Sequence, residues 1–167
     1  MSTPSRLAPD KEFPPYAFLP GRDPHPTRDP AGHSYGEDEP SPGYFDPADW
    51  RANVEYLWGI DLYNHGYLWE AHEAWEGLWH AAKHDEVQAY FLQGLIQCTA
   101  ACLKISMEQP RGLERLSALG TEKLEGVVRE KGGTYMGLDV VAFVAEMRSF
   151  AASAPDSIDE RPEIDLA

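Results

Sequence analysis

The 167-residue chain is short of basic residues: it has 14 lysines and arginines against 28 aspartates and glutamates, for a formal net charge of −14. Proteins that bind nucleic acids use lysine and arginine to neutralise phosphates, and anionic membranes attract the same side chains. The charge balance therefore argues against both as partners. We interpret the acidic surface as one that keeps the protein in solution.

The chain also lacks a long apolar run. No stretch approaches the roughly 20 residues needed to cross a bilayer. The N-terminal sequence MSTPSRLAPDKEF has no apolar core of the kind found in secretory signals. These absences predict a soluble, cytoplasmic protein without membrane contact. Hydrophobic residues make up 43% of the chain, which is enough to form the core of one globular domain.

Cysteine is scarce, with only Cys98 and Cys102 present. In a helix, two cysteines four residues apart share a face, but their side chains run parallel, which does not suit a disulfide. A zinc site would need a second cysteine or histidine pair with matching spacing, and the chain has none. We therefore expect both to be buried as small apolar side chains.

Proline, by contrast, is concentrated at one end: eleven of the 14 prolines lie in residues 1–47. Proline removes backbone donors and restricts the residue before it, so this segment cannot be helical. We predict an extended arm over residues 1–46, ordered because four aromatic residues pin it to the body. These residues are Phe13, Tyr16, Phe18 and Tyr35.

The remainder predicts an all-α fold, a bundle of about five helices over residues 47–150, followed by an acidic tail over 151–167. Asp46 and Pro47 suit a helix start, Gly66 suits a helix end, and Asp85 can cap the third helix. Residues 153–167 hold acids and prolines and are expected to fray. The expected helices begin at Pro47, span 67–83, begin at Asp85, span 110–129 and span 139–150; the apolar stripe of the first is Val54, Leu57, Trp58 and Leu62.

The segment WEAHEAWEGLWH (residues 69–80) carries the candidate site. In the expected helix, His72 and Glu76 lie one turn apart on the margin of the apolar face, with Glu73 nearer to solvent. The third helix, otherwise apolar, has a polar stripe that includes Gln93 and Gln97. Buried amides need partners, so we predict that this stripe packs against His72 and Glu76 in a buried polar network.

Two interpretations of His72 and Glu76 remain open. They could belong to a buried network that fixes the packing of the helices. Alternatively, a histidine and a carboxylate one turn apart can bind a divalent metal, or act as a base and its orienting partner. A metal would need further ligands. The candidates are Glu73 and His80 on the same helix and His25 or His33 from the arm.

Two sequence elements at a specific separation resemble the bacterial and archaeal domain-of-unknown-function family 309. The first is H-x3-E-x2-W, formed by His72, Glu76 and Trp79, and the second is the run QGLIQ at residues 93–97. An N-x-G-x-x-W-E-A element precedes them and includes Trp69. The resemblance covers about residues 50–145. It implies a compact helical bundle and supplies no activity.

Three functions are compatible with these features to different degrees. We favour a binding or structural module, with the five tryptophans as anchors for a protein partner or a second copy of the chain. The alternative is a metal-dependent hydrolase acting on a small molecule, with His72 and Glu76 as ligand or base. Nucleic-acid binding has least support. Acidic residues interrupt the basic residues of the fourth helix, which are Arg111, Arg115, Lys123 and Arg129.

Overall fold

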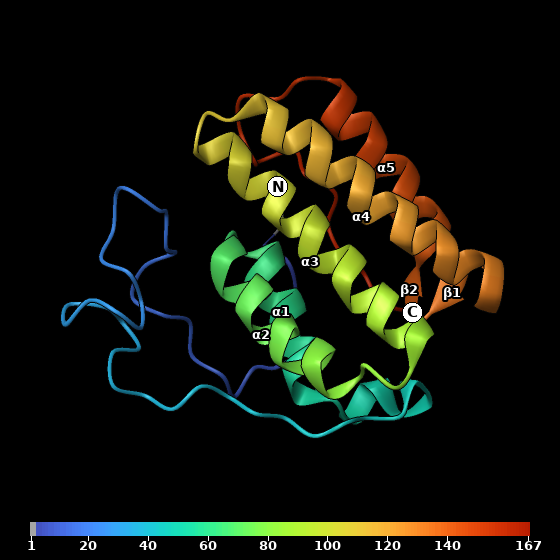
Figure 1. Cartoon of the computed structure of the whole chain (residues 1–167), viewed down its shortest axis with the longest axis horizontal. Coiled ribbons are helices and arrows are strands. Elements are labelled where there is room, and N and C mark those ends of the chain that lie inside the picture. Colours follow the sequence, from blue (N-terminus) through green and yellow to red (C-terminus); the bar gives the residue numbers. More distant parts are fainter. Residues whose placement is uncertain (1–2) are drawn as a thin grey trace.

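The computed structural model describes residues 3–167 and confirms the all-α fold. Figure 1 shows the helices packed together, with the N-terminal arm running along one side of them. No helix in this part of the chain is both long and apolar enough to cross a membrane. The elements are the 3-10 helix η1 (Pro47–Ala52), α1 (Val54–Asn64), α2 (Leu68–Ala81), α3 (Glu86–Ser106), α4 (Pro110–Lys131), β1 (Thr134–Tyr135), β2 (Leu138–Asp139) and α5 (Val140–Ala152).

Helix α3 is the centre of the bundle, as its apolar sequence predicted. It packs against α2 on one side and α4 on the other, while α1 covers α2 and α5 covers α4 (Figure 1). Helices α3 and α4 approach closely where two glycines meet. A Cβ atom at Gly94 would lie 2.7 Å from the Leu124 side chain, and one at Gly120 would lie 2.7 Å from the Cys98 sulfur. Both cysteines are buried and free, as predicted.

The predicted caps define the helix ends. The Asp46 side chain accepts a hydrogen bond from the Ala48 N–H at 2.8 Å, and Asp85 accepts one from the Gln88 N–H at 3.1 Å. Gly66 has the expected positive φ of 86°. However, the helix that begins at Pro47 is only a short 3-10 helix. Asn53 then caps α1 separately, by accepting a hydrogen bond from the Tyr56 N–H.

A two-stranded hairpin was not predicted. Strands β1 and β2 pair antiparallel and are joined by Met136 and Gly137, which have φ of 46° and 81°. Two successive residues with positive φ are typical of the tight turns that join antiparallel strands. Each strand has only two residues, so the sequence contains too short an alternation to indicate a strand.

The arm lies on α1 and α2, and two of the four predicted aromatics hold it closely. Phe13 stacks on Tyr67 with a centroid separation of 4.9 Å, and Phe18 is buried against Trp69. Tyr35 differs from the prediction because 54% of it is exposed. The arm is also held by polar contacts: the buried carboxylate of Asp61 accepts hydrogen bonds from the arm's backbone and from an arginine.

The C-terminal tail does not fray, contrary to expectation. The Arg161 guanidinium donates to the carbonyl oxygens of Tyr63 and Asn64, at 2.6 and 2.8 Å, and so caps the C-terminal end of α1. The Asn64 side chain donates to the Ile164 carbonyl and accepts from the Ile164 N–H. Ile164 is 3% exposed. These contacts stabilise a tail whose composition alone resembles that of a disordered segment.

Candidate functional site

Helix α2 presents the candidate site along one edge of its buried face. Its buried apolar residues follow helical spacing, with Ala71 and Trp75 four residues apart and both 0% exposed. The Trp75 indole N–H donates to the Tyr56 carbonyl at 3.2 Å, which fixes α2 against α1. His72 directly follows Ala71, so its side chain projects at the margin of this contact, where it meets solvent.

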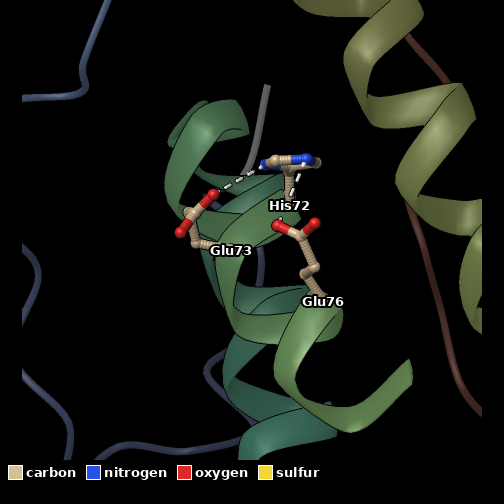
Figure 2. A group of neighbouring side chains, drawn as sticks. All are labelled: His72, Glu73 and Glu76. Carbon is tan, nitrogen blue, oxygen red and sulfur yellow. Dashed lines mark ion pairs between the residues drawn. The ribbon is translucent and has the colours of Figure 1, made fainter. Parts of the chain in front are cut away.

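His72, Glu73 and Glu76 come together on this edge. Figure 2 shows both carboxylates pointing toward the imidazole. The His72 Nδ1 atom lies 3.3 Å from Glu73 Oε1, and Nε2 lies 3.8 Å from Glu76 Oε2. The side chains are 29%, 39% and 40% exposed respectively. One donor atom from each of the three residues lies within 4.8 Å of the others.

The carboxylates control the charge of the imidazole. Burial lowers the pKa of His72, but the hydrogen bond to Glu73 and the charges of Glu73 and Glu76 outweigh it, so the pKa of His72 is raised overall. The same hydrogen bond to His72 is the main reason that the pKa of Glu73 is lowered. The cluster therefore favours an ionised Glu73 beside an imidazole that protonates readily.

The glutamine stripe does not join this cluster. In residues 3–167, no hydrogen bond connects Gln93 or Gln97 to His72 or Glu76, and the Gln97 Oε1 atom is buried without a partner. The structure differs here from the predicted buried network. The reason is local: His72 is served by carboxylates on its own helix, and all three side chains reach water.

The other histidines proposed as further ligands lie elsewhere. His80 is exposed at the end of α2, and the Nδ1 atom of His25 is within 3.3 Å of two backbone N–H groups of its own turn. His33 binds Glu70. Of the two motif tryptophans, Trp69 packs edge-on against Phe18 and His25 of the arm. Trp79 lies under the Lys83 ammonium, 4.8 Å from its ring centroid.

The tryptophans are also not free anchors for a partner. All five are buried or half-buried within the chain itself. The exposed large apolar side chains are instead scattered: Leu7, Tyr35, Tyr44, Val54, Tyr90, Leu119 and Val141. Two shallow hollows, of about 350 and 460 Å³, lie along α4 and α5 and share Glu125 and Arg148. Neither hollow includes a residue of the His72 cluster.

Comparison with known families supports the resemblance read from the motifs. Residues 56–116 match the model of a family described as a domain of unknown function (DUF309). The predicted family is thereby confirmed. Searches of curated proteins and of solved structures gave no match. The arm and tail lie outside the DUF309 match.

Several residues of the DUF309 segment hold the terminal segments in place. Asn64 pairs with Ile164 of the tail, and Trp69 packs against Phe18 of the arm. Glu70, which is 6% exposed, accepts hydrogen bonds from the Phe18 N–H at 2.8 Å and from His33 at 3.0 Å. Sequence reasoning missed this role of Glu70. The available signal was an acid followed by Ala71 on the core side of the helix.

Proposed function

We propose that this helical domain binds a divalent metal ion through His72, Glu73 and Glu76. The observation that carries the proposal is the convergence of one donor atom from each residue within 4.8 Å. An imidazole with two carboxylates is a ligand set suited to zinc, manganese or ferrous iron. Small rotations of the exposed glutamates would bring the three atoms to metal-ligand distances.

The surroundings of the cluster favour a cation over a purely structural role. With His72 neutral, the two carboxylates leave a local charge of about −2. In the described part of the chain, Glu73 and Glu76 form ion pairs only with His72, and no lysine or arginine pairs with either. A cation could therefore bind without displacing an existing partner. The partial exposure of all three side chains also allows an ion to enter from solvent.

A second candidate, metal-dependent hydrolysis of a small molecule, extends this proposal. Three protein ligands leave at least one coordination position for water, and a bound metal lowers the pKa of that water toward neutrality. The exposed edge of α2 gives water and a small substrate access to the same position. In this role, His72 and the glutamates act as ligands that fix the ion.

Metal binding is tested by dialysing the untagged full-length protein against zinc or manganese and measuring bound metal by elemental analysis. We expect about one ion per chain, lost in His72→Ala and at least ~10-fold weaker in Glu76→Gln. The matched control is His80→Ala, which changes an exposed histidine of the same helix. Substoichiometric metal, or equal binding by all variants, would contradict the proposal. Absent metal with a large fall in melting temperature for His72→Ala would support the structural role.

Hydrolysis is tested separately with the metal-loaded protein and p-nitrophenyl phosphate. We expect turnover that disappears on chelation and in His72→Ala, while His80→Ala retains it. A protein that binds metal through His72 but gives no turnover would retain the binding function and refute the hydrolase. Turnover that survives both chelation and His72→Ala would also refute it.

A further inference from the structure

Ser34, His33 and Glu70 form a hydrogen-bonded row where the arm crosses α2. The Ser34 Oγ atom lies 2.8 Å from His33 Nδ1, and His33 Nε2 lies 3.0 Å from Glu70 Oε1. Serine and histidine come from the arm, and the glutamate comes from the helix. The row consists of a hydroxyl, an imidazole and a carboxylate, which is the order of groups that activates a serine in many hydrolases.

The partners of Glu70 determine where the protons lie. Its Oε1 atom accepts from the Phe18 N–H at 2.8 Å, as an ionised carboxylate would. An ionised carboxylate can only accept, so the hydrogen of the neutral imidazole must be on Nε2 of His33. The Nδ1 atom then carries a lone pair, and the Ser34 hydroxyl must be the donor in the 2.8 Å contact. His33 is therefore placed as a base for Ser34.

Burial distinguishes the three groups in a way that suits this role. The His33 and Glu70 side chains are 4% and 6% exposed, whereas Ser34 is only half-buried and can be reached from solvent. The Tyr16 ring packs on the imidazole, with centroids 4.8 Å apart, and its hydroxyl accepts from the His33 N–H. Glu70 Oε2 is buried with no hydrogen-bond partner in residues 3–167, so the carboxylate keeps capacity to stabilise an imidazolium.

We propose that Ser34 is a nucleophile toward small carboxylic esters, with His33 as its base and Glu70 orienting the imidazole. The net charge of −14 favours neutral or cationic esters over anionic ones. This site shares no residue with the His72 cluster and does not depend on a metal.

The reaction would proceed in two balanced steps. Ser34 Oγ bonds to the ester carbonyl carbon as its proton moves to His33 Nδ1. The C–O bond to the alcohol then breaks, and the alcohol leaves with that proton, giving an acyl-serine. In the second step His33 takes a proton from water, and the resulting hydroxide attacks the acyl carbon. The carboxylic acid leaves, and Ser34 regains its proton.

A fluorophosphonate probe tests the nucleophile directly in the full-length protein, in buffer with a chelator so that metal chemistry is absent. In this reaction the Ser34 Oγ–P bond forms, the P–F bond breaks, fluoride leaves, and the proton passes through His33 to solvent. We expect one adduct, mapped to Ser34 by mass spectrometry. It should form about 100-fold faster than any adduct at Ser41, an exposed serine of the same arm.

Variants separate activation from simple exposure. Ser34→Ala should abolish labelling, and Ser41→Ala should leave it unchanged. Glu70→Gln should slow labelling of Ser34 at least ~10-fold in protein that retains its melting transition. Ser34 labelling no faster than that of Ser41 overturns the proposal, whether or not the Glu70 variant folds. Unchanged labelling in a folded Glu70→Gln protein overturns the role assigned to Glu70.

Discussion

Asp61 of α1 and Arg6 of the arm form an ion pair, with Arg6 Nε 3.0 Å from Asp61 Oδ2. The Asp61 side chain is 1% exposed, and it also accepts hydrogen bonds from the backbone N–H groups of Leu7 and Ala8, both at 2.8 Å. One buried carboxylate thus fixes three consecutive residues of the arm. With Glu70, it gives the arm two polar attachment points on neighbouring helices.

Replacing Asp61 should therefore destabilise the protein more than replacing an exposed acid that also contacts the arm. We expect Asp61→Ala to lower the free energy of unfolding by roughly 2–3 kcal/mol, because it strands the buried Ala8 N–H and removes charged hydrogen bonds. Glu55→Ala is the matched control. Glu55 pairs with Lys11 of the arm at 2.7 Å, but that pair is partly exposed and should contribute less than about 1 kcal/mol. Urea titration measures both, and equal losses would contradict the prediction.

Arg161 should determine the order of the C-terminal tail. Its guanidinium donates to the last carbonyl groups of α1, so Arg161→Ala leaves those acceptors without a partner. We expect a loss of about 1–3 kcal/mol in unfolding free energy, together with faster amide exchange at Ile164 and Ala167. Arg111→Ala, which changes an exposed arginine of α4, is the control. Unchanged exchange in the Arg161 variant would show that the apolar contacts of the tail suffice.

The fold could largely be predicted because its signals are local. Asp85 and Asp139 cap their helices as single residues, and a run of apolar residues identified α3 as central. The contacts of the termini are different in kind. Asp61 meets residues more than 50 positions away, and the pattern along α1 does not reveal that. The predicted stripe of α1 was also partly wrong: Val54 is 51% exposed, whereas Ile60 is fully buried.

The candidate site was predictable to the extent that it lies on one helix. The spacing of His72, Glu73 and Glu76 brings their side chains together in any α-helix. Contacts between helices depend on rotations that spacing does not determine, and for this reason the predicted link from His72 to Gln97 did not appear. The row formed by Ser34 and His33 with Glu70 lay beyond reach for the same reason, since it joins the arm to α2 across 37 positions.

The pH dependence of the His72 cluster follows from the direction of its pKa shifts. A raised pKa for His72 means that its charge stabilises the fold below about pH 6.5, and this contribution is lost as the pH rises through the folded pKa. A lowered pKa for Glu73 stabilises the fold above about pH 4.5 and is lost as the pH falls through the folded pKa. The stability difference between the native protein and Glu73→Gln should thus be largest between these values.

Titration of the His72 imidazole by NMR in metal-free buffer tests the cause of this shift. Glu73→Gln removes the hydrogen bond and charge that raise the pKa of His72, so that pKa should fall. Glu130→Gln, which changes an exposed acid of α4, should leave it unchanged. An unaltered His72 titration in Glu73→Gln would mean that the carboxylate does not control the imidazole.

The two cysteines should be inert in the folded protein despite being free thiols. Burial raises the pKa of Cys102 to about 12 and that of Cys98 further still, and both are 0% exposed. Because the thiolate is the reactive form, neither should react with a disulfide reagent at pH 8 within minutes, whereas both should react in urea. Ser41→Cys supplies an exposed thiol for comparison. The raised pKa values also predict that stability falls as the pH rises above about 9, where the unfolded thiols ionise and the folded ones do not. Native cysteines that react as fast as the one introduced at position 41 would show that the helices around α3 open readily.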